Sequence, residues 1–147
     1  VNGDYNCAKN LLETLKGSPI VTHNFDCSNN NLTTLEYRPQ NVEGNFLCSY
    51  NQLISLKGSP SLINGSFECN NNELISLEGS PITVKVSFIC SNNKLQSLKG
   101  NLKRVGETFD CSNNDLTSLE GSPLKIEGSF ACNNNFLKSL YPKCSPL

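Results

Sequence analysis

The stretch Phe-Glu-Cys-Asn-Asn-Asn-Glu-Leu-Ile-Ser-Leu at residues 67–77 decides the fold, because versions of it recur along the whole chain. In each version an aromatic residue stands two residues before a cysteine. An asparagine follows three residues after that cysteine, and leucines follow at five and eight residues. The cysteines are Cys7, Cys27, Cys48, Cys69, Cys90, Cys111 and Cys132, so the spacing is 20 residues once and 21 residues thereafter. A fixed period of this length is typical of a solenoid, in which each repeat forms one coil.

The repeats account for all 147 residues, so we expect a single domain without a linker. The units are 1–20, 21–41, 42–62, 63–83, 84–104, 105–125 and 126–147. Phe67 and Cys69 are expected to point inward and Glu68 outward, which is the alternation of a strand. A β-branched residue, such as Val21 or Val42, opens each unit. Gly-Ser-Pro segments such as 58–60 exclude a helix on the return path.

These features predict an all-β-like solenoid of seven stacked coils. Each coil should contribute one strand to a parallel sheet on one face and an irregular, extended back without α-helices.

The pattern Phe-x-Cys-x-x-Asn-x-Leu-x-x-Leu resembles the leucine-rich repeat family, and the resemblance covers the whole chain. The short period and the proline in the return path are similar to the bacterial type found in secreted effectors. The Asp-Cys-Ser-Asn-Asn segments at 26–30 and 110–114 look like repeats of tailed phages and giant viruses. The resemblance implies a protein–protein interaction module. An aromatic residue replaces the usual leucine, and the ubiquitin-ligase domain that follows the repeats in some effectors does not occur here, so that activity is not carried over.

Two inward columns are expected to hold the coils together. Amides of the asparagine column can satisfy backbone groups that a corner would otherwise bury unpaired. The cysteine column is expected to contain buried thiols, with disulfides or a metal site as alternatives. The residues of this structural ladder are Asn30, Asn51, Asn72, Asn93 and Asn114, with Cys27, Cys48, Cys69, Cys90 and Cys111. Cys144 lies outside the column, where we expect a free thiol or, alternatively, an inter-chain bond.

Composition excludes several functions. The chain has 12 basic and 13 acidic residues, a net charge of −1, so it lacks the basic excess that drives binding to nucleic acid. No apolar stretch approaches the length that spans a bilayer, so membrane insertion is not expected. Few aromatic side chains are available for a glycan to stack on, so glycan binding is not expected. No nucleophile, base and orienting group occur together, and His23 is the only histidine, so we expect neither an enzyme nor a cofactor or metal.

Two outward columns alternate from coil to coil. The residues after the second leucine are Lys16, Glu36, Lys57, Glu78, Lys99 and Glu120, and opposite charges on adjacent coils are expected to pair. The residues between the aromatic residue and the cysteine are Asp26, Leu47, Glu68, Ile89, Asp110 and Ala131. We call this second column the acid–apolar row. It is interpreted either as avoidance of repulsion or as a striped binding face. Around it we expect an outer face of small polar residues, Ser49, Ser91 and Ser112 among them.

Outward residues that break the repeat are the candidates for contact with a partner. The first group is Leu47, Tyr50 and Ile54, together with Ile89 of the acid–apolar row. The second is the pair Tyr37 and Arg38, which replaces Gly-Ser. The third is Lys85, Lys103 and Arg104, which we expect to form a basic patch with Lys125, either simply solvated or in contact with a partner or an anion.

The expected function is a non-catalytic protein–protein interaction module. The alternative is a structural subunit of a larger assembly, for example a phage or viral particle, packed through its faces or an open end. The partner is therefore another protein or a neighbouring subunit. Reduced cysteines favour a reducing cytoplasm or a virus or phage particle over a disulfide-rich extracellular setting.

Overall fold

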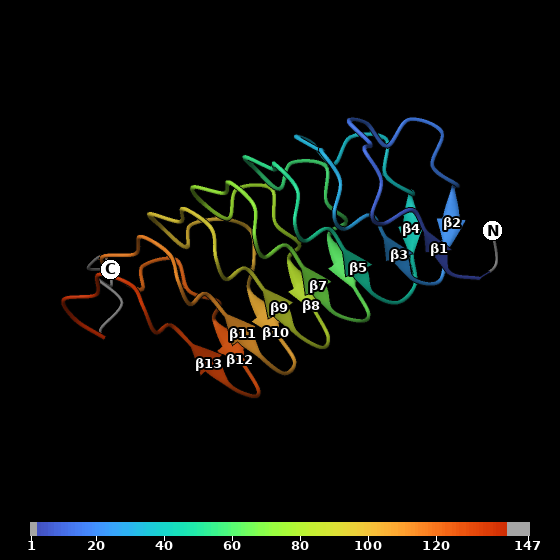
Figure 1. Cartoon of the computed structure of the whole chain (residues 1–147). Coiled ribbons are helices and arrows are strands. Elements are labelled where there is room, and N and C mark those ends of the chain that lie inside the picture. The colour runs from blue at the N-terminus through green and yellow to red at the C-terminus, as the bar shows by residue number, and fades with distance from the viewer. Residues whose placement is uncertain (1–2, 141–147) are drawn as a thin grey trace.

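The protein is a parallel β-solenoid, seen in a computed structural model that describes residues 3–140. Figure 1 shows the coils stacked along one axis, with β1 at one end and β13 at the other. The described residues contain no helix, and hence none long and apolar enough to cross a membrane. The strands are β1 (Tyr5–Asn6), β2 (Val21–Thr22), β3 (Phe25–Asp26), β4 (Asn41–Val42), β5 (Phe46–Leu47), β6 (Leu62–Ile63), β7 (Phe67–Glu68), β8 (Thr83–Val84), β9 (Phe88–Ile89), β10 (Arg104–Val105), β11 (Phe109–Asp110), β12 (Lys125–Ile126) and β13 (Phe130–Ala131).

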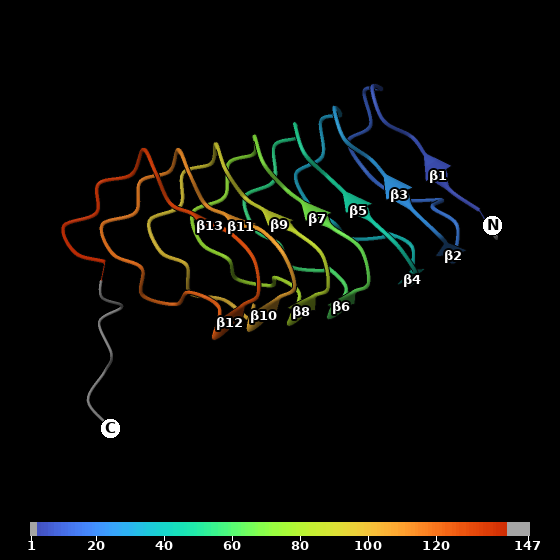
Figure 2. The same ribbon diagram turned by 90° about the horizontal axis from the view of Figure 1, so that it is seen from below.

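The main sheet contains one strand from each coil and is parallel throughout. Its order is β1-β3-β5-β7-β9-β11-β13, and these strands lie side by side in Figure 2. The register places Phe46 beside Phe25 and Phe67, and Leu47 beside Asp26 and Glu68. Residues at the same position of the repeat are therefore neighbours in space. This confirms the predicted solenoid and its parallel sheet.

The prediction of one strand per coil was wrong, because the β-branched column forms further strands. β6, β8, β10 and β12 form a four-stranded sheet, and β2 pairs with β4. We call these two pieces together the second sheet. Each of its strands contains one inward residue, such as Val84 or Val105, next to one outward residue. β4 and β6 are not paired, so the second sheet is interrupted between them.

The strand β2, which opens the unit 21–41, has a different register from its counterparts in the later coils. Thr22 is fully buried and Val21 is only half-buried, although Val21 opens its unit as the buried Val42 opens the next. β2 pairs with β4 so that Thr22 lies beside Val42. The reason is the corner that follows: two residues separate Thr22 from Phe25, whereas three separate Val42 from Phe46. The Thr22 hydroxyl lies within hydrogen-bond distance of the carbonyl oxygens of Gly3 (2.9 Å) and Asn24 (2.7 Å), so its burial leaves no polar atom unpaired.

The core is a set of stacked columns of identical residues. Phe25, Phe46, Phe67, Phe88 and Phe109 are all fully buried. The centroids of neighbouring rings in this column, from Tyr5 to Phe130, lie 5.2–6.2 Å apart. Both leucines of each inner coil are buried beside these rings. Because no layer of helices covers the sheet, the core is thin and depends on this stacking.

The asparagine column joins each coil to its predecessor. Nδ2 of Asn72 donates to the carbonyls of Cys69 in its own coil (3.0 Å) and Cys48 in the preceding coil (3.1 Å). Its Oδ1 accepts the N–H of Leu53 (3.0 Å). The same contacts recur at Asn30, Asn51, Asn93, Asn114 and Asn135. Each amide therefore satisfies backbone groups at a corner that the core closes off from water.

The alternating charges pair only in part: within residues 3–140, Lys16 and Glu36 form no ion pair, and the two lysines that do pair contact only the following coil. Lys57 lies 3.1 Å from Glu78, and Lys99 lies 3.1 Å from Glu120, in each case the glutamate of the following coil. The expected second partner of Lys99, Glu78, is not in ion-pair contact with it. All four side chains are exposed, so these pairs contribute little stability.

Candidate functional site

The acid–apolar row crosses the outer face of the main sheet. The register pairs Asp26 with Leu47, Leu47 with Glu68, Glu68 with Ile89, and Ile89 with Asp110. These side chains are half-buried, which means that each presents part of its surface to solvent. The structure therefore brings Leu47 and Ile89 into one row, with Glu68 between them.

The acids of the row have no basic partner. Oδ1 of Asp26 accepts the N–H (3.0 Å) and the hydroxyl (2.6 Å) of Ser28, and Asp110 binds Ser112 in the same way. These bonds occupy one carboxylate oxygen each. Within residues 3–140, no Lys, Arg or His forms an ion pair with Asp26, Glu68 or Asp110. The negative charge of the row is therefore open to an external cation.

The small polar residues beside the row are less exposed than predicted. Ser49, Ser91 and Ser112 are buried, although they were expected on the outer face. They follow the cysteine at the point where the chain turns, and each lies between residues of the coils above and below. Ser49, for example, donates to Oδ1 of Asn70 (2.5 Å). Because these neighbouring serines are small and buried, they leave the side chains of the acid–apolar row accessible to solvent.

Tyr50 follows Leu47 at the end of β5 and has an unusual backbone. Its φ is 55°, in the left-handed region, and its side chain is 55% exposed. Five other coils have asparagine at this position with φ near 55°, and the first described coil has Lys9. Asparagine tolerates this conformation, whereas a bulky residue is strained in it. Ile54 lies at the next corner of the same coil and is also exposed.

Tyr37 is strained in the same way on a different corner. Its φ is 64°, at a position where Gly17, Gly58, Gly79 and Gly121 have positive φ. Its side chain is 64% exposed, so no burial of the ring compensates for the strain.

Arg38, the next residue, is turned toward the protein backbone. Its guanidinium donates to the carbonyls of Gly58, Pro39 and Gln40, the last at 3.1 Å. Partial burial lowers the pKa of Arg38 from its ordinary value, but an arginine remains charged at neutral pH. These contacts brace the corner, so Arg38 has a structural task that the sequence did not indicate.

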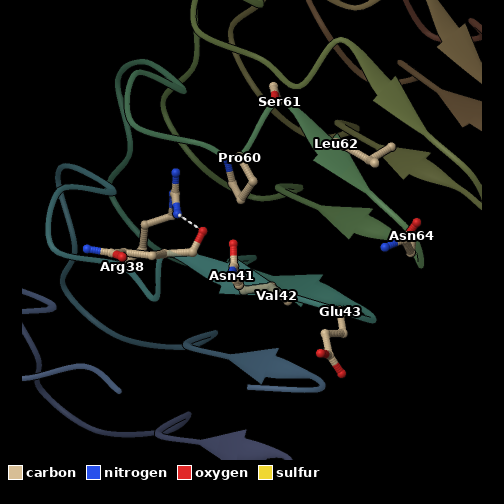
Figure 3. A pocket seen from close by; sticks show the side chains of 9 residues that line it. Arg38, Asn41, Val42, Glu43, Pro60, Ser61, Leu62 and Asn64 are labelled. Atoms are coloured by element: carbon tan, nitrogen blue, oxygen red, sulfur yellow. Dashed lines mark hydrogen bonds between the residues drawn. The ribbon is translucent and has the colours of Figure 1, made fainter. Parts of the chain in front are cut away.

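A pocket of about 370 Å³ lies where the second sheet is interrupted. Figure 3 shows Arg38 on one side of it and Glu43 and Asn64 on the other, with Asn41 and Pro60 between. The pocket thus lies between β4 and β6, and groups of both charges line it. Sequence reasoning missed this site, because the two strands that border it look like their counterparts in other coils.

The predicted basic patch is partly neutralised. Glu127 accepts from Arg104 (2.6 Å) and lies 2.9 Å from Lys125. Lys125, followed by Arg104, lowers the pKa of Glu127. The patch was expected to be basic, but Arg104 and Lys125 share the acid Glu127, which lies one coil after Arg104 and two residues after Lys125. Lys85 lines a pocket of about 390 Å³ with Arg104 and Glu127, whereas Lys103 is exposed outside it.

Ile75 is an exposed apolar residue that the sequence analysis did not select. It lies one coil after Ile54 at the same position, and the two side chains are 57% and 65% exposed. The signal was available, because this outward column reads Thr33, Ile54, Ile75 and Gln96.

The cysteine column is buried in all inner coils. Cys27, Cys48, Cys69, Cys90 and Cys111 are fully buried, and Cys7 and Cys132 are half-buried. All seven cysteines in the described part of the chain are free, and no group there is arranged to hold a metal ion. Burial raises the pKa of each inner thiol, that of Cys111 to about 12. Cys144 lies outside the described residues.

Comparison of the chain with protein-family models, with curated proteins and with solved structures returns no match.

Proposed function

We propose that the protein is a non-catalytic protein–protein interaction module, and that its contact surface includes Tyr50 with the neighbouring Leu47. One observation carries this proposal. Tyr50 and Tyr37 both have left-handed φ angles at positions that asparagine or glycine occupies in other coils, and both side chains are largely exposed. A bulky residue in this conformation destabilises the fold by about 1 kcal/mol.

Stability therefore does not explain these tyrosines, and strained residues that persist are found mostly at functional positions. Tyrosine is also among the residues that contribute most to binding at protein interfaces. Leu47 and Ile54 extend the apolar surface on either side of Tyr50 along the same coil. The repeat pattern of inward leucine and asparagine further supports an assignment of the coils to the leucine-rich repeat family, whose implied role is protein binding.

The test is site-specific photo-crosslinking. A photoreactive phenylalanine analogue replaces Tyr50 in one variant and Asn101, an exposed residue outside the candidate contact groups, in a matched control. Both are illuminated in extracts of the cells that produce the protein, and products are identified by mass spectrometry. We expect one discrete crosslinked protein from position 50 and none from position 101.

The substitution Leu47→Ser, added to the position-50 variant, should lower the yield of that product while the circular dichroism spectrum is unchanged. No product at position 50, or the same product at position 101, would overturn the proposal. A product made of two copies of this chain would instead support the hypothesis of a structural subunit.

A further inference from the structure

We propose that the acid–apolar row binds a polyproline II segment of a partner protein that carries lysine or arginine at every third residue. This inference rests on the proposed function, because it names the partner chemistry for the same face. It follows from the spacing of the acids, their lack of basic partners, and the apolar residues between them.

The spacing of the row selects the conformation of the partner. Asp26, Glu68 and Asp110 are separated by two coils each, because the register pairs every coil with the next. Neighbouring strands lie about 4.8 Å apart, so two coils span about 9.6 Å. A polyproline II helix has three residues per turn and a rise of 3.1 Å, so every third side chain points the same way after about 9.3 Å.

Other conformations fit the row less well. In an extended strand, side chains on one face recur after about 6.7 Å, which matches neither one coil nor two. In an α-helix, side chains seven residues apart recur on one face after about 10.5 Å, so the mismatch reaches almost 2 Å over the three acids. The polyproline II mismatch over the same span is about 0.6 Å.

The charges of the row favour a basic partner. Asp26, Glu68 and Asp110 are half-exposed, and within residues 3–140 none of them forms an ion pair. Four glutamates on other parts of the surface do form ion pairs with lysine or arginine, namely Glu73, Glu78, Glu120 and Glu127. The lysines and arginines of the described chain all lie in other columns. A segment with regularly spaced cations would therefore meet three unpaired carboxylates in line.

The apolar residues of the row suit the rest of such a segment. Leu47 and Ile89 lie between the acids, where they would contact the residues between the cations. Tyr50 lies just beyond the end of β5 on the same coil as Leu47, and it presents an exposed ring. Proline-rich segments dock on aromatic and apolar surfaces, and they lose little conformational entropy because they are already extended in solution.

The experiment uses the full chain and synthetic peptides labelled with a fluorophore. The probe consists of repeated Lys-Pro-Pro triplets, and the matched control has the same composition with all lysines at one end. A third peptide alternates lysine and serine. Binding is followed by fluorescence anisotropy near physiological ionic strength, and the bound conformation by circular dichroism.

We expect the triplet peptide to bind at least several-fold more tightly than either control and to keep its polyproline II spectrum. Glu68→Gln should weaken its binding by about threefold, as the loss of one exposed ion pair implies. Glu107→Gln removes one exposed acid outside the row and should leave binding within about twofold. Asp26→Asn and Asp110→Asn keep the oxygen that binds Ser28 or Ser112, so adding both to Glu68→Gln should abolish binding without unfolding the chain.

Equal binding of the triplet and grouped peptides would overturn the inference, because charge alone would then explain it. A gain of helix in the bound peptide, or no binding of any peptide, would also overturn it. These failures are distinguishable from failure of the proposed function, because crosslinking from position 50 does not depend on the peptide probe.

Discussion

At the scale of single residues, the pair Asn-Asn in most coils has two different tasks. The first asparagine, such as Asn71 or Asn92, takes a left-handed φ where the chain turns at the end of the main strand. The second, such as Asn72, donates to and accepts from the backbone of two coils. Tyr50 stands at the position of the first asparagine, where replacing asparagine by a bulky residue strains the backbone.

The strain at Tyr50 leads to a reciprocal stability prediction. Tyr50→Asn should raise the free energy of unfolding by about 0.5–1 kcal/mol, because asparagine tolerates left-handed φ and the exposed ring loses little burial. Asn92→Tyr, at the same position two coils later, should lower it by a similar amount. Urea denaturation of both variants measures the two changes. A loss of stability in Tyr50→Asn would show that the ring packs on the protein.

The period of the repeat made the inward residues predictable, whereas exceptions within single coils were not. Phe67, Cys69 and Leu74 could be placed inward because the same residues recur in every coil. Thr22 could not, because the chain compensates for a shortened corner by moving the inward position by one residue. The contacts of Glu127 with Arg104 and Lys125 join different columns, so no comparison within one column reveals them.

At the scale of the elements, the corner amides matter more than the strands. Each strand is two residues long, and a pairing of this length gives few hydrogen bonds. The asparagine column adds further bonds between each coil and the preceding one, in a buried setting where an unpaired group is costly. The second sheet could not be predicted, since alternation over two residues is too short to recognise as a strand.

The column gives a prediction with a matched control. Asn72→Leu removes its bonds to Leu53, Cys48 and Cys69 and leaves buried backbone groups unpaired, which should destabilise the fold by about 3 kcal/mol or more. Asn10→Leu makes the same substitution in the first described coil, where the side chain is exposed and donates only within its own coil. Its cost should be below about 1 kcal/mol. Equal losses in thermal or urea unfolding would contradict this account.

At the scale of the whole molecule, the buried thiols predict instability in alkali. Burial raises the pKa of the five inner thiols, so they stay protonated at pH values at which an ordinary thiol ionises. These thiols belong to Cys27, Cys48, Cys69, Cys90 and Cys111. The unfolded chain releases these protons above about pH 8.5, so it binds fewer protons than the folded chain there. The stabilising contribution is therefore complete below about pH 8.5 and is lost as the pH rises toward about 12, the pKa of Cys111.

Each titrating thiol should lower the free energy of unfolding by up to about 1.4 kcal/mol per pH unit. The check is urea denaturation under reducing conditions from neutral pH to about pH 10, the range in which ordinary thiols ionise. Cys69→Ala should be less stable at neutral pH. Its free energy of unfolding should fall less steeply as the pH rises, because one of the titrating thiols is missing. A free energy of unfolding that does not change across this range would exclude burial of the column.

The two-coil alternation also governs how such a gene can change in length. Loss of the single unit 63–83 would join like to like, with Leu47 beside Ile89 and Lys57 beside Lys99. Loss of the double unit 63–104 would place Leu47 beside Asp110 and Lys57 beside Glu120, so both alternations would survive. Unequal crossing-over that adds or removes coils in pairs would therefore be tolerated, whereas odd steps would be selected against. Proteins that descend from a common repeat ancestor of this chain should thus differ from one another by even numbers of coils.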